Sequence, residues 1–195
     1  MAFQIIQIIY WLTLSTWFGG VLFFFILAPV IFKTIREANP VLPGVLSVNL
    51  ESAHANLLAE SILGNALALL GYVQIGAGIV LILIGIAQFF VIDLSDRNLL
   101  GAILRISLIV AATAIAAVDR FIFRPRLFRF RNEYVEHADD PDLAKTAREN
   151  FDREYNRSEM TLRIIWVILL AVVLYSANIF PASVSLSRPA AAATP

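Results

Sequence analysis

Cysteine is absent from the 195-residue chain, histidine occurs only twice, and charged residues make up just 15% of it. Without cysteine the protein can form no disulfide, no thiolate metal site and no cysteine nucleophile. His54 and His137 both lie outside the long apolar segments, so histidine ligation of haem or chlorophyll inside a membrane helix is excluded. The sequence also lacks a P-loop, a Rossmann fingerprint and a Ser/His/Asp set. These absences exclude the common nucleotide-binding and hydrolytic enzymes, and we expect no cofactor.

Charge is missing from long stretches of the chain, which are rich in apolar residues. Apolar residues make up 59% of the sequence, compared with about 45–50% in soluble domains. About 20 apolar residues in a helix cross the hydrocarbon core of a bilayer, and four segments qualify: 3–32, 62–92, 99–118 and 162–180. The first has no basic region before it and is too long for a signal peptide, so we interpret it as a retained helix. The sequence therefore predicts an all-α integral membrane four-helix bundle, one domain over residues 1–180, followed by a disordered tail over 181–195.

The positive charges are distributed unequally between the two ends of the predicted helices. Of the 15 Lys and Arg residues, twelve fall in or beside segments 33–61 and 119–161. Arg97 and Arg188 lie at the opposite end, and Arg105 lies inside a span. Because cytoplasmic loops carry the excess of Lys and Arg, both termini are predicted to be non-cytoplasmic. The pattern is typical of a multi-pass protein of a bacterial cytoplasmic (inner) membrane.

Between the third and fourth spans the sequence predicts a long cytoplasmic helical extension. Asp140 and Pro141 are typical of a helix N-cap and first turn, and no helix breaker follows before Pro181. The fourth helix should therefore begin at Pro141 and project beyond the bilayer, with an apolar stripe from Leu143 to Tyr155. Helices 1 and 2 should also extend past the cytoplasmic face, whereas helix 3 should just fit the membrane.

The second span carries glycines at a seven-residue spacing, namely Gly64, Gly71, Gly78 and Gly85. A seven-residue repeat drifts by only about 20° per step around a straight helix, so these glycines form a bare stripe. Such a stripe lets a neighbouring helix approach closely, and the alanine-rich third span is the expected partner. Gln74 and Gln88 flank the stripe. We interpret them as hydrogen-bonding groups between helices, with a polar pathway as the alternative.

Arg105 is the one charged residue inside a predicted span, and intramembrane charges are candidate functional residues. It lies near the outer end of its helix, so its side chain can snorkel towards the surface. Pairing with Asp93 or Asp96 is a second structural role. The functional alternative is a substrate or anion site.

A basic segment follows the third span, with phenylalanines between its arginines: Arg120, Arg124, Arg126, Arg129 and Arg131. Arginines close to a cytoplasmic membrane surface attract anionic lipid, by about 1 kcal/mol each. We therefore expect contact with membrane lipids, including anionic lipid. Nucleic acid is not an expected partner, because the segment lies against the membrane.

Glu51 and His54 have the Glu-x-x-His spacing that places two metal ligands on one face of a helix. Di-iron helical bundles use this motif twice, together with two further glutamates. Glu133 and His137 are four residues apart rather than three, so they do not supply a second copy. A metal site at Glu51 and His54 is an alternative to a solvated helix face.

Several short motifs resemble a known family. They are Trp17-Phe18-Gly19-Gly20 and residues 28–32 in the first span, Arg124-Pro125-Arg126 after the third, and Phe151, Tyr155 and Ser158 before the fourth. Together they are similar to the uncharacterised bacterial proteins grouped with eukaryotic transmembrane protein 205. The resemblance implies a four-helix membrane fold and no established activity.

The leading functional hypothesis is a non-catalytic integral membrane protein that acts through helix packing, as an accessory or scaffold subunit of a membrane complex. Its expected partners are membrane lipids, other membrane subunits or a second copy of itself. The alternative is a small transporter or channel that uses Arg105, Gln74 and Gln88. A metal-dependent membrane enzyme is the third hypothesis.

Overall fold

The computed structural model describes residues 2–38, 40, 54–91, 96–137 and 139–179, nearly all of them in helices. The elements are α1 (Ala2–Ala38), α2 (His54–Val91), α3 (Asp96–Val118), the π-helical turn η2 (Asp119–Phe123), α4 (Arg124–Glu136) and α5 (Pro141–Ile179). Four helices are long and apolar enough to cross a membrane, with α3, η2 and α4 counting as one. The all-α class and the four helices of spanning length are therefore confirmed, as in a multi-pass membrane protein. The tail predicted to be disordered lies outside the described residues.

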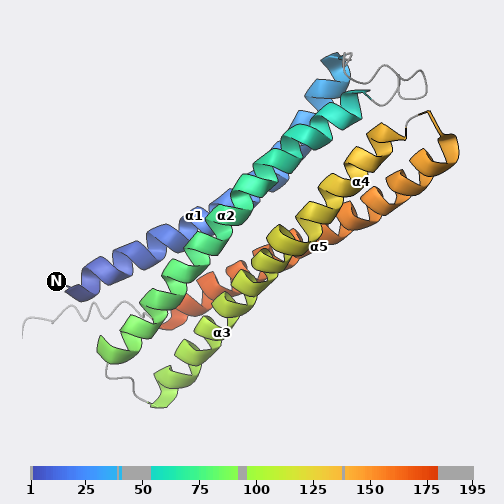
Figure 1. Ribbon diagram of the computed structural model, residues 1–195. Helices are drawn as coiled ribbons and strands as arrows, with labels where there is room; N and C mark the ends of the chain where they lie inside the picture. The colour runs from blue at the N-terminus through green and yellow to red at the C-terminus, as the bar shows by residue number, and fades with distance from the viewer. Residues whose placement is uncertain (1, 39, 41–53, 92–95, 138, 180–195) are drawn as a thin grey trace, which may run out of the picture.

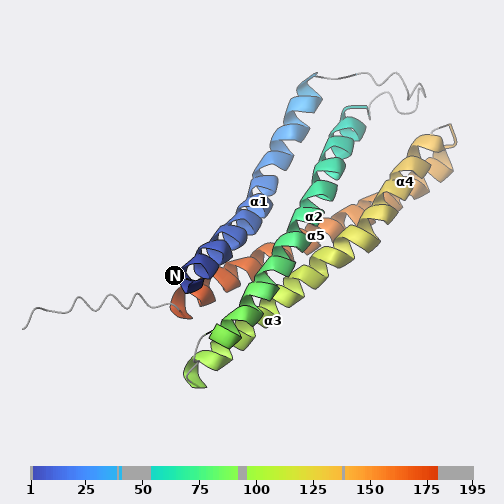
Figure 2. The same cartoon turned by 60° about the vertical axis from the view of Figure 1, so that its left-hand side comes forward.

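The long helices lie side by side in an elongated bundle (Figure 1). α1 packs on α2, α2 packs on α3, and α5 packs on α3 and α4. The start of α1, the end of α2, the start of α3 and the end of α5 lie at one end of the bundle (Figures 1 and 2). The end of α4 and the start of α5 lie at the opposite end, which we call the hairpin end.

Buried residues recur along the helices at alternating steps of three and four. In α1 they are Tyr10, Leu14, Trp17, Val21 and Phe24. In α2 the buried residues at this spacing are Leu57, Glu60, Gly64, Leu67, Gly71, Gln74, Gly78, Leu81, Gly85 and Gln88, and His54, Ala59 and Leu63 are buried as well. This heptad spacing is typical of helices that pack at small crossing angles along their length. The remaining faces carry large exposed apolar side chains, as expected of helices that face lipid.

The four spaced glycines of α2 are buried and face α3, η2 and α4. A β-carbon added to them would lie closest to Phe128 at Gly64, Arg120 at Gly71, Thr113 at Gly78 and Ile106 at Gly85. The tightest approach is at Gly78, where the added carbon would lie 2.1 Å from Thr113 Oγ1. The absence of side chains on this stripe therefore sets how closely α2 approaches its neighbours.

α5 begins where the sequence predicts, at Pro141. Asp140 Oδ1 accepts the backbone N–H of Asp142 at 3.1 Å and that of Leu143 at 3.2 Å, which confirms Asp140 as the N-cap. The apolar stripe predicted from Leu143 to Tyr155 is buried at Ala147 and Phe151, but not at its first residue. Leu143 is 50% exposed, because the heptad spacing of α5 buries Ala144 instead.

α3 ends at Val118, as the sequence suggested, but the helical structure does not stop there. It continues through η2 into α4, as far as Glu136. Pro125 would break a helix interior, but it lies in the first turn of α4 directly after the π-helical turn, where a missing N–H is tolerated. How the third helix fits the membrane stays a prediction, but its helical structure extends well beyond the apolar segment 99–118.

Candidate functional site

The π-helical turn η2 holds a buried ion pair between α3, α4 and α5. In a π-helix a backbone N–H bonds to the carbonyl five residues earlier, and here the Arg124 N–H donates to Asp119 O. The side chains of the same two residues also meet. Arg124 Nε lies 3.0 Å from Asp119 Oδ2, and the two side chains are only 3% and 8% exposed. Ser158 of α5 donates its hydroxyl to the other carboxylate oxygen at 2.5 Å.

The extra residue of the π-helical turn decides which side chain faces the interior. The buried positions of α3 reach Ala116 and Asp119 at the heptad spacing, and the next step of four would bury Phe123. Instead Arg124 takes the buried position, and Leu127 follows it. Sequence reasoning grouped Arg124 with the lipid-contacting arginines. The one sequence signal for a buried Arg124 is its separation of five residues from Asp119, the spacing of a π-helical turn.

A cavity of about 350 Å³ lies beside this ion pair, between α1 and α5. Its α1 side is apolar and includes Phe24, Phe25 and Ala28. The opposite side is polar and consists of Arg124, Tyr155, Ser158, Glu159 and Arg163, next to the apolar Leu162. Sequence reasoning did not find this cavity, because it depends on which parts of α1 and α5 lie at the same level.

A second polar cluster lies inside the bundle towards the end opposite the hairpin. Arg105 Nη2 donates to Gln88 Oε1 at 2.5 Å, and the Arg105 guanidinium lies 5.0 Å from the centre of the Tyr10 ring. The hydroxyls of Tyr10 and Ser176 are hydrogen-bonded at 2.6 Å. All four residues are buried. Each long helix therefore contributes one polar side chain to this cluster.

The structure brings together two of the three residues that the sequence grouped as intramembrane polar residues. Gln88 and Arg105 are bonded, whereas Gln74, although buried, lies two heptads from Gln88 along α2. That separation is about 21 Å along the helix axis. Tyr10 and Ser176 were missed, because only the heptad spacing of the buried positions marks them as inward-facing. The side chains of Asp93 and Asp96, considered as partners of Arg105, lie outside those described.

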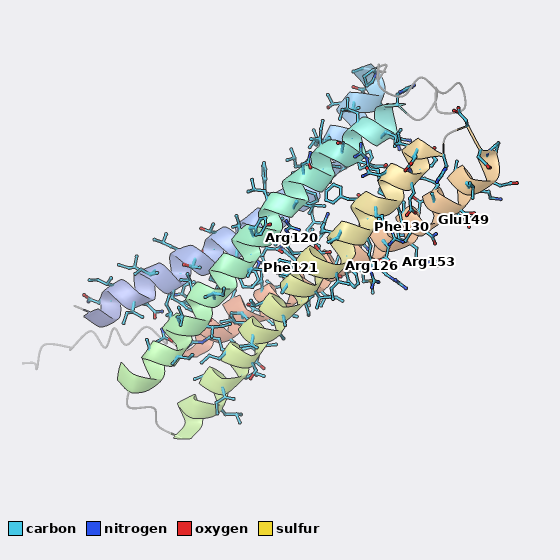
Figure 3. All side chains as sticks on the ribbon, viewed as in Figure 1. Arg120, Phe121, Arg126, Phe130, Glu149 and Arg153 are labelled. Atoms are coloured by element: carbon cyan, nitrogen blue, oxygen red, sulfur yellow. The ribbon has the colours of Figure 1, made fainter. Side chains whose placement is uncertain are left out.

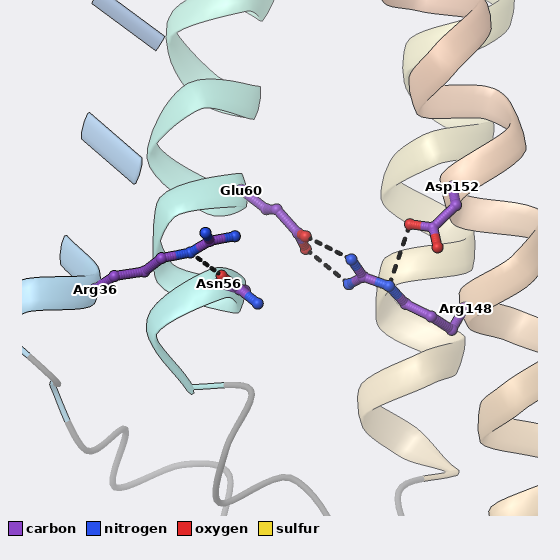
Figure 4. A network of polar contacts seen from close by, with 5 residues as sticks. All are labelled: Arg36, Asn56, Glu60, Arg148 and Asp152. Carbon is purple, nitrogen blue, oxygen red and sulfur yellow. Dashed lines mark hydrogen bonds and ion pairs between the residues drawn. The ribbon is translucent and has the colours of Figure 1, made fainter. Parts of the chain in front are cut away.

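A third polar cluster joins α2 to α5, beside α1, at the hairpin end (Figure 4). Arg148 donates through both terminal nitrogens to Glu60, at 2.9 and 3.2 Å. Its Nε lies 3.2 Å from Asp152, and Arg36 of α1 donates to Asn56 of α2 at 2.9 Å. The Glu60 side chain is only 7% exposed, so the two-pronged bond from Arg148 neutralises a buried carboxylate.

The five arginines predicted to contact anionic lipid do not share one surface. One of them forms the buried ion pair described above. Arg120 lies 4.3 Å from the centre of the Tyr72 ring and donates to its hydroxyl at 2.6 Å. Arg126 and Arg129 are exposed, and Arg131 is half-buried. Of the five arginines, only Arg126 and Arg129 are therefore fully exposed, and contact with anionic lipid stays a prediction.

The candidate metal site falls partly outside the structure, since Glu51 is not among the described residues. His54 is buried at the start of α2 and interacts with a neighbour. Glu60 and Glu133 are each paired with an arginine. Within the described ranges, no three side chains of His, Asp or Glu are grouped so as to hold a metal ion.

Comparisons of the chain with protein-family models, with curated proteins and with solved structures find no match. What the protein does is therefore inferred from its own side chains and their geometry.

Proposed function

We propose that the protein is a non-catalytic integral membrane protein that serves as an accessory or scaffold subunit of a larger membrane complex. The observation that carries the proposal is that buried polar side chains from different helices are hydrogen-bonded to one another inside the bundle. The bonds are those of Tyr10 with Ser176, Arg105 with Gln88, and Asp119 with Arg124 and Ser158. Polar groups used in this way hold membrane helices together, whereas a reactive centre needs groups that can reach a substrate.

A transport pathway has less support from the geometry. Such a pathway would need a polar route between Gln74 and Arg105, and these residues lie at different levels of the bundle. The cavity beside the Asp119 ion pair is lined by neither of them.

We further propose that both termini are non-cytoplasmic and that α4 and the first half of α5 lie in the cytoplasm, at the inner membrane of a bacterium. The unequal distribution of Lys and Arg supports this orientation. Arg129 then faces the cytoplasmic leaflet, where anionic headgroups attract exposed arginines. Membership of the transmembrane protein 205 group would be consistent with the proposal, because the resemblance implies the same fold and no established activity.

The surface proposed to bind the partner subunit is the outer face of α4 and α5 at the hairpin end. Arg126 of α4 and Glu149 and Arg153 of α5 are exposed there, and Figure 3 shows them on the outside of the paired helices. A surface with charges of both signs favours a specific protein partner of complementary charge.

The proposal is tested by extracting the tagged chain from its native membranes in mild detergent and measuring the mass and composition of the particle. We expect a stoichiometric second protein to elute with the wild-type chain. The double variant Arg126→Glu, Arg153→Glu should release it without changing the thermal stability of the chain, because both side chains are exposed. The matched control Arg126→Lys, Arg153→Lys keeps both charges and should retain the partner. A chain that purifies alone and moves a solute or ion when reconstituted in liposomes would contradict the proposal.

A further inference from the structure

The cavity beside the buried ion pair has two chemically different walls at the same level of the bundle. The apolar stretch of α1 continues to Phe32, so the α1 wall at Phe24, Phe25 and Ala28 is apolar. The apolar stretch of α5 begins only at Leu162, so the facing part of α5 is still polar. Because the apolar segments of α1 and α5 end at different levels, the cavity has one apolar wall and one polar wall. We place it at the level where a bilayer changes from acyl chains to headgroups.

Arg124 presents hydrogen-bond donors that no other described residue uses. Its Nε is bonded to Asp119, and no acceptor for its two terminal nitrogens is found among the described residues. The residue is only 2% exposed and lines the cavity. A buried guanidinium with free terminal N–H groups is suited to a phosphate or carboxylate, which it can bind with two parallel hydrogen bonds.

The charges around the cavity are balanced, which restricts the ligand further. Arg124 is paired with Asp119, and Arg163 is paired with Glu159 at 2.5 Å. A ligand with a single net negative charge would leave excess charge beside the buried pair of Arg124 and Asp119, which is costly. A ligand with one negative and one positive group keeps the balance, with its anion at Arg124 and its cation at Glu159, whose side chain is 40% exposed.

We infer that the cavity binds one phospholipid with a zwitterionic headgroup, taken from the leaflet at the hairpin end. The phosphate accepts hydrogen bonds from the terminal nitrogens of Arg124, and the ammonium group lies at Glu159. The start of an acyl chain follows the apolar wall of α1, at Phe24, Phe25 and Ala28. The volume of about 350 Å³ falls at the lower end of the range for small-molecule sites, about 300–1,000 Å³, so it accommodates the headgroup region while the rest of the acyl chains remains in the bilayer.

The test is native mass spectrometry of the full chain, delipidated in detergent and titrated separately with phosphatidylethanolamine, phosphatidylglycerol, palmitate and inorganic phosphate. We expect one phosphatidylethanolamine to bind at least about tenfold more tightly than the anionic phosphatidylglycerol, the equivalent of one hydrogen bond to a charged group. Palmitate and inorganic phosphate should not displace it, since each offers only part of the required chemistry.

Two variants distinguish the cavity from lipid bound elsewhere on the surface. Ala28→Phe fills the cavity from the α1 wall without touching the ion pair, and it should weaken the first binding step by about tenfold or more. Its matched control is Val30→Phe, two residues further on the same helix and 53% exposed, which should bind like the wild type.

A second variant keeps the test decisive if Ala28→Phe does not fold. Arg124→Lys retains the positive charge opposite Asp119 but loses the paired N–H donors of the guanidinium. This variant should also bind the lipid about tenfold more weakly. Equal binding by Ala28→Phe and Val30→Phe, or by Arg124→Lys and the wild type, would overturn the assignment. Tighter binding of phosphatidylglycerol, palmitate or inorganic phosphate than of phosphatidylethanolamine would also overturn it. The result is independent of whether a partner protein is found.

Discussion

Replacing Arg124 by leucine is expected to lower the free energy of unfolding by about 3–5 kcal/mol, the usual cost of removing one partner of a buried ion pair. The Asp119 carboxylate would remain buried, since its side chain is 8% exposed, and it would keep only the hydrogen bond from Ser158. The loss should be measurable as reduced resistance to unfolding by SDS in mixed micelles, or as a lower midpoint of thermal unfolding in detergent.

The control for this substitution lies two residues further along the same helix. Arg126→Leu removes an exposed arginine and should change the free energy of unfolding by no more than about 0.5 kcal/mol. Adding Asp119→Asn to Arg124→Leu should recover part of the loss, because the stranded charge is then gone. If Arg124→Leu proves as stable as Arg126→Leu, the buried ion pair does not exist as described.

Replacing Gly78 by alanine is expected to destabilise the bundle by about 1–3 kcal/mol, the usual cost of overpacking a well-packed core. The added β-carbon would lie 2.1 Å from Thr113 Oγ1 and 2.9 Å from Thr113 Cβ. The Thr113 hydroxyl cannot turn away without cost, because it donates to the Ile109 carbonyl at 2.7 Å. α2 and α3 must therefore move apart, and neighbouring contacts are lost. The free energy of unfolding in SDS mixed micelles measures the effect.

Gly76 provides the matched control on the same helix. A β-carbon there would meet nothing within 4 Å, so Gly76→Ala should gain helix propensity, up to about 1 kcal/mol. The two substitutions are chemically identical and only two residues apart, so the difference between them isolates the close contact of α2 with α3. Equal effects of Gly76→Ala and Gly78→Ala on unfolding would show that the glycine stripe does not face α3.

The parts of the fold that could be predicted from the sequence are those set by local patterns. Long runs without charge marked the four helices of spanning length, because a bilayer core imposes their minimum length and composition. The start of α5 was also predictable, since Asp140 and Pro141 act within a single helical turn. The packing face of α2 could be predicted from the seven-residue spacing of its glycines, because helix periodicity alone places them on one side.

The features that could not be predicted depend on helix rotation or on contacts between distant residues. The π-helical turn inserts one residue into an otherwise regular helix. As a result the Arg124 side chain faces the interior, although the sequence predicted that it contacts lipid. The bond between Glu60 and Arg148 joins residues 88 positions apart, which no local pattern indicates. Tyr10 and Ser176 were missed for the same reason, because they are 166 positions apart.

These interior bonds also explain how a small bundle can carry so many buried polar residues. Each of the three polar clusters joins at least two helices, so the polar groups stabilise the packing rather than disrupt it. At the cavity beside Asp119 and Arg124, a buried cation with unused donors lies next to a space that can hold a ligand.

The most direct test of the central claim, four crossings with the hairpin end in the cytoplasm, is labelling of single cysteines with a membrane-impermeant maleimide. The chain has no native cysteine, so each introduced thiol reports on one position only. In spheroplasts we expect the reagent to label Ala2→Cys. Ala38→Cys and Asp139→Cys, which lie at the other end of the bundle, should react only after the membrane is permeabilised. Labelling of Asp139→Cys in intact spheroplasts to the same extent as Ala2→Cys would contradict the claim.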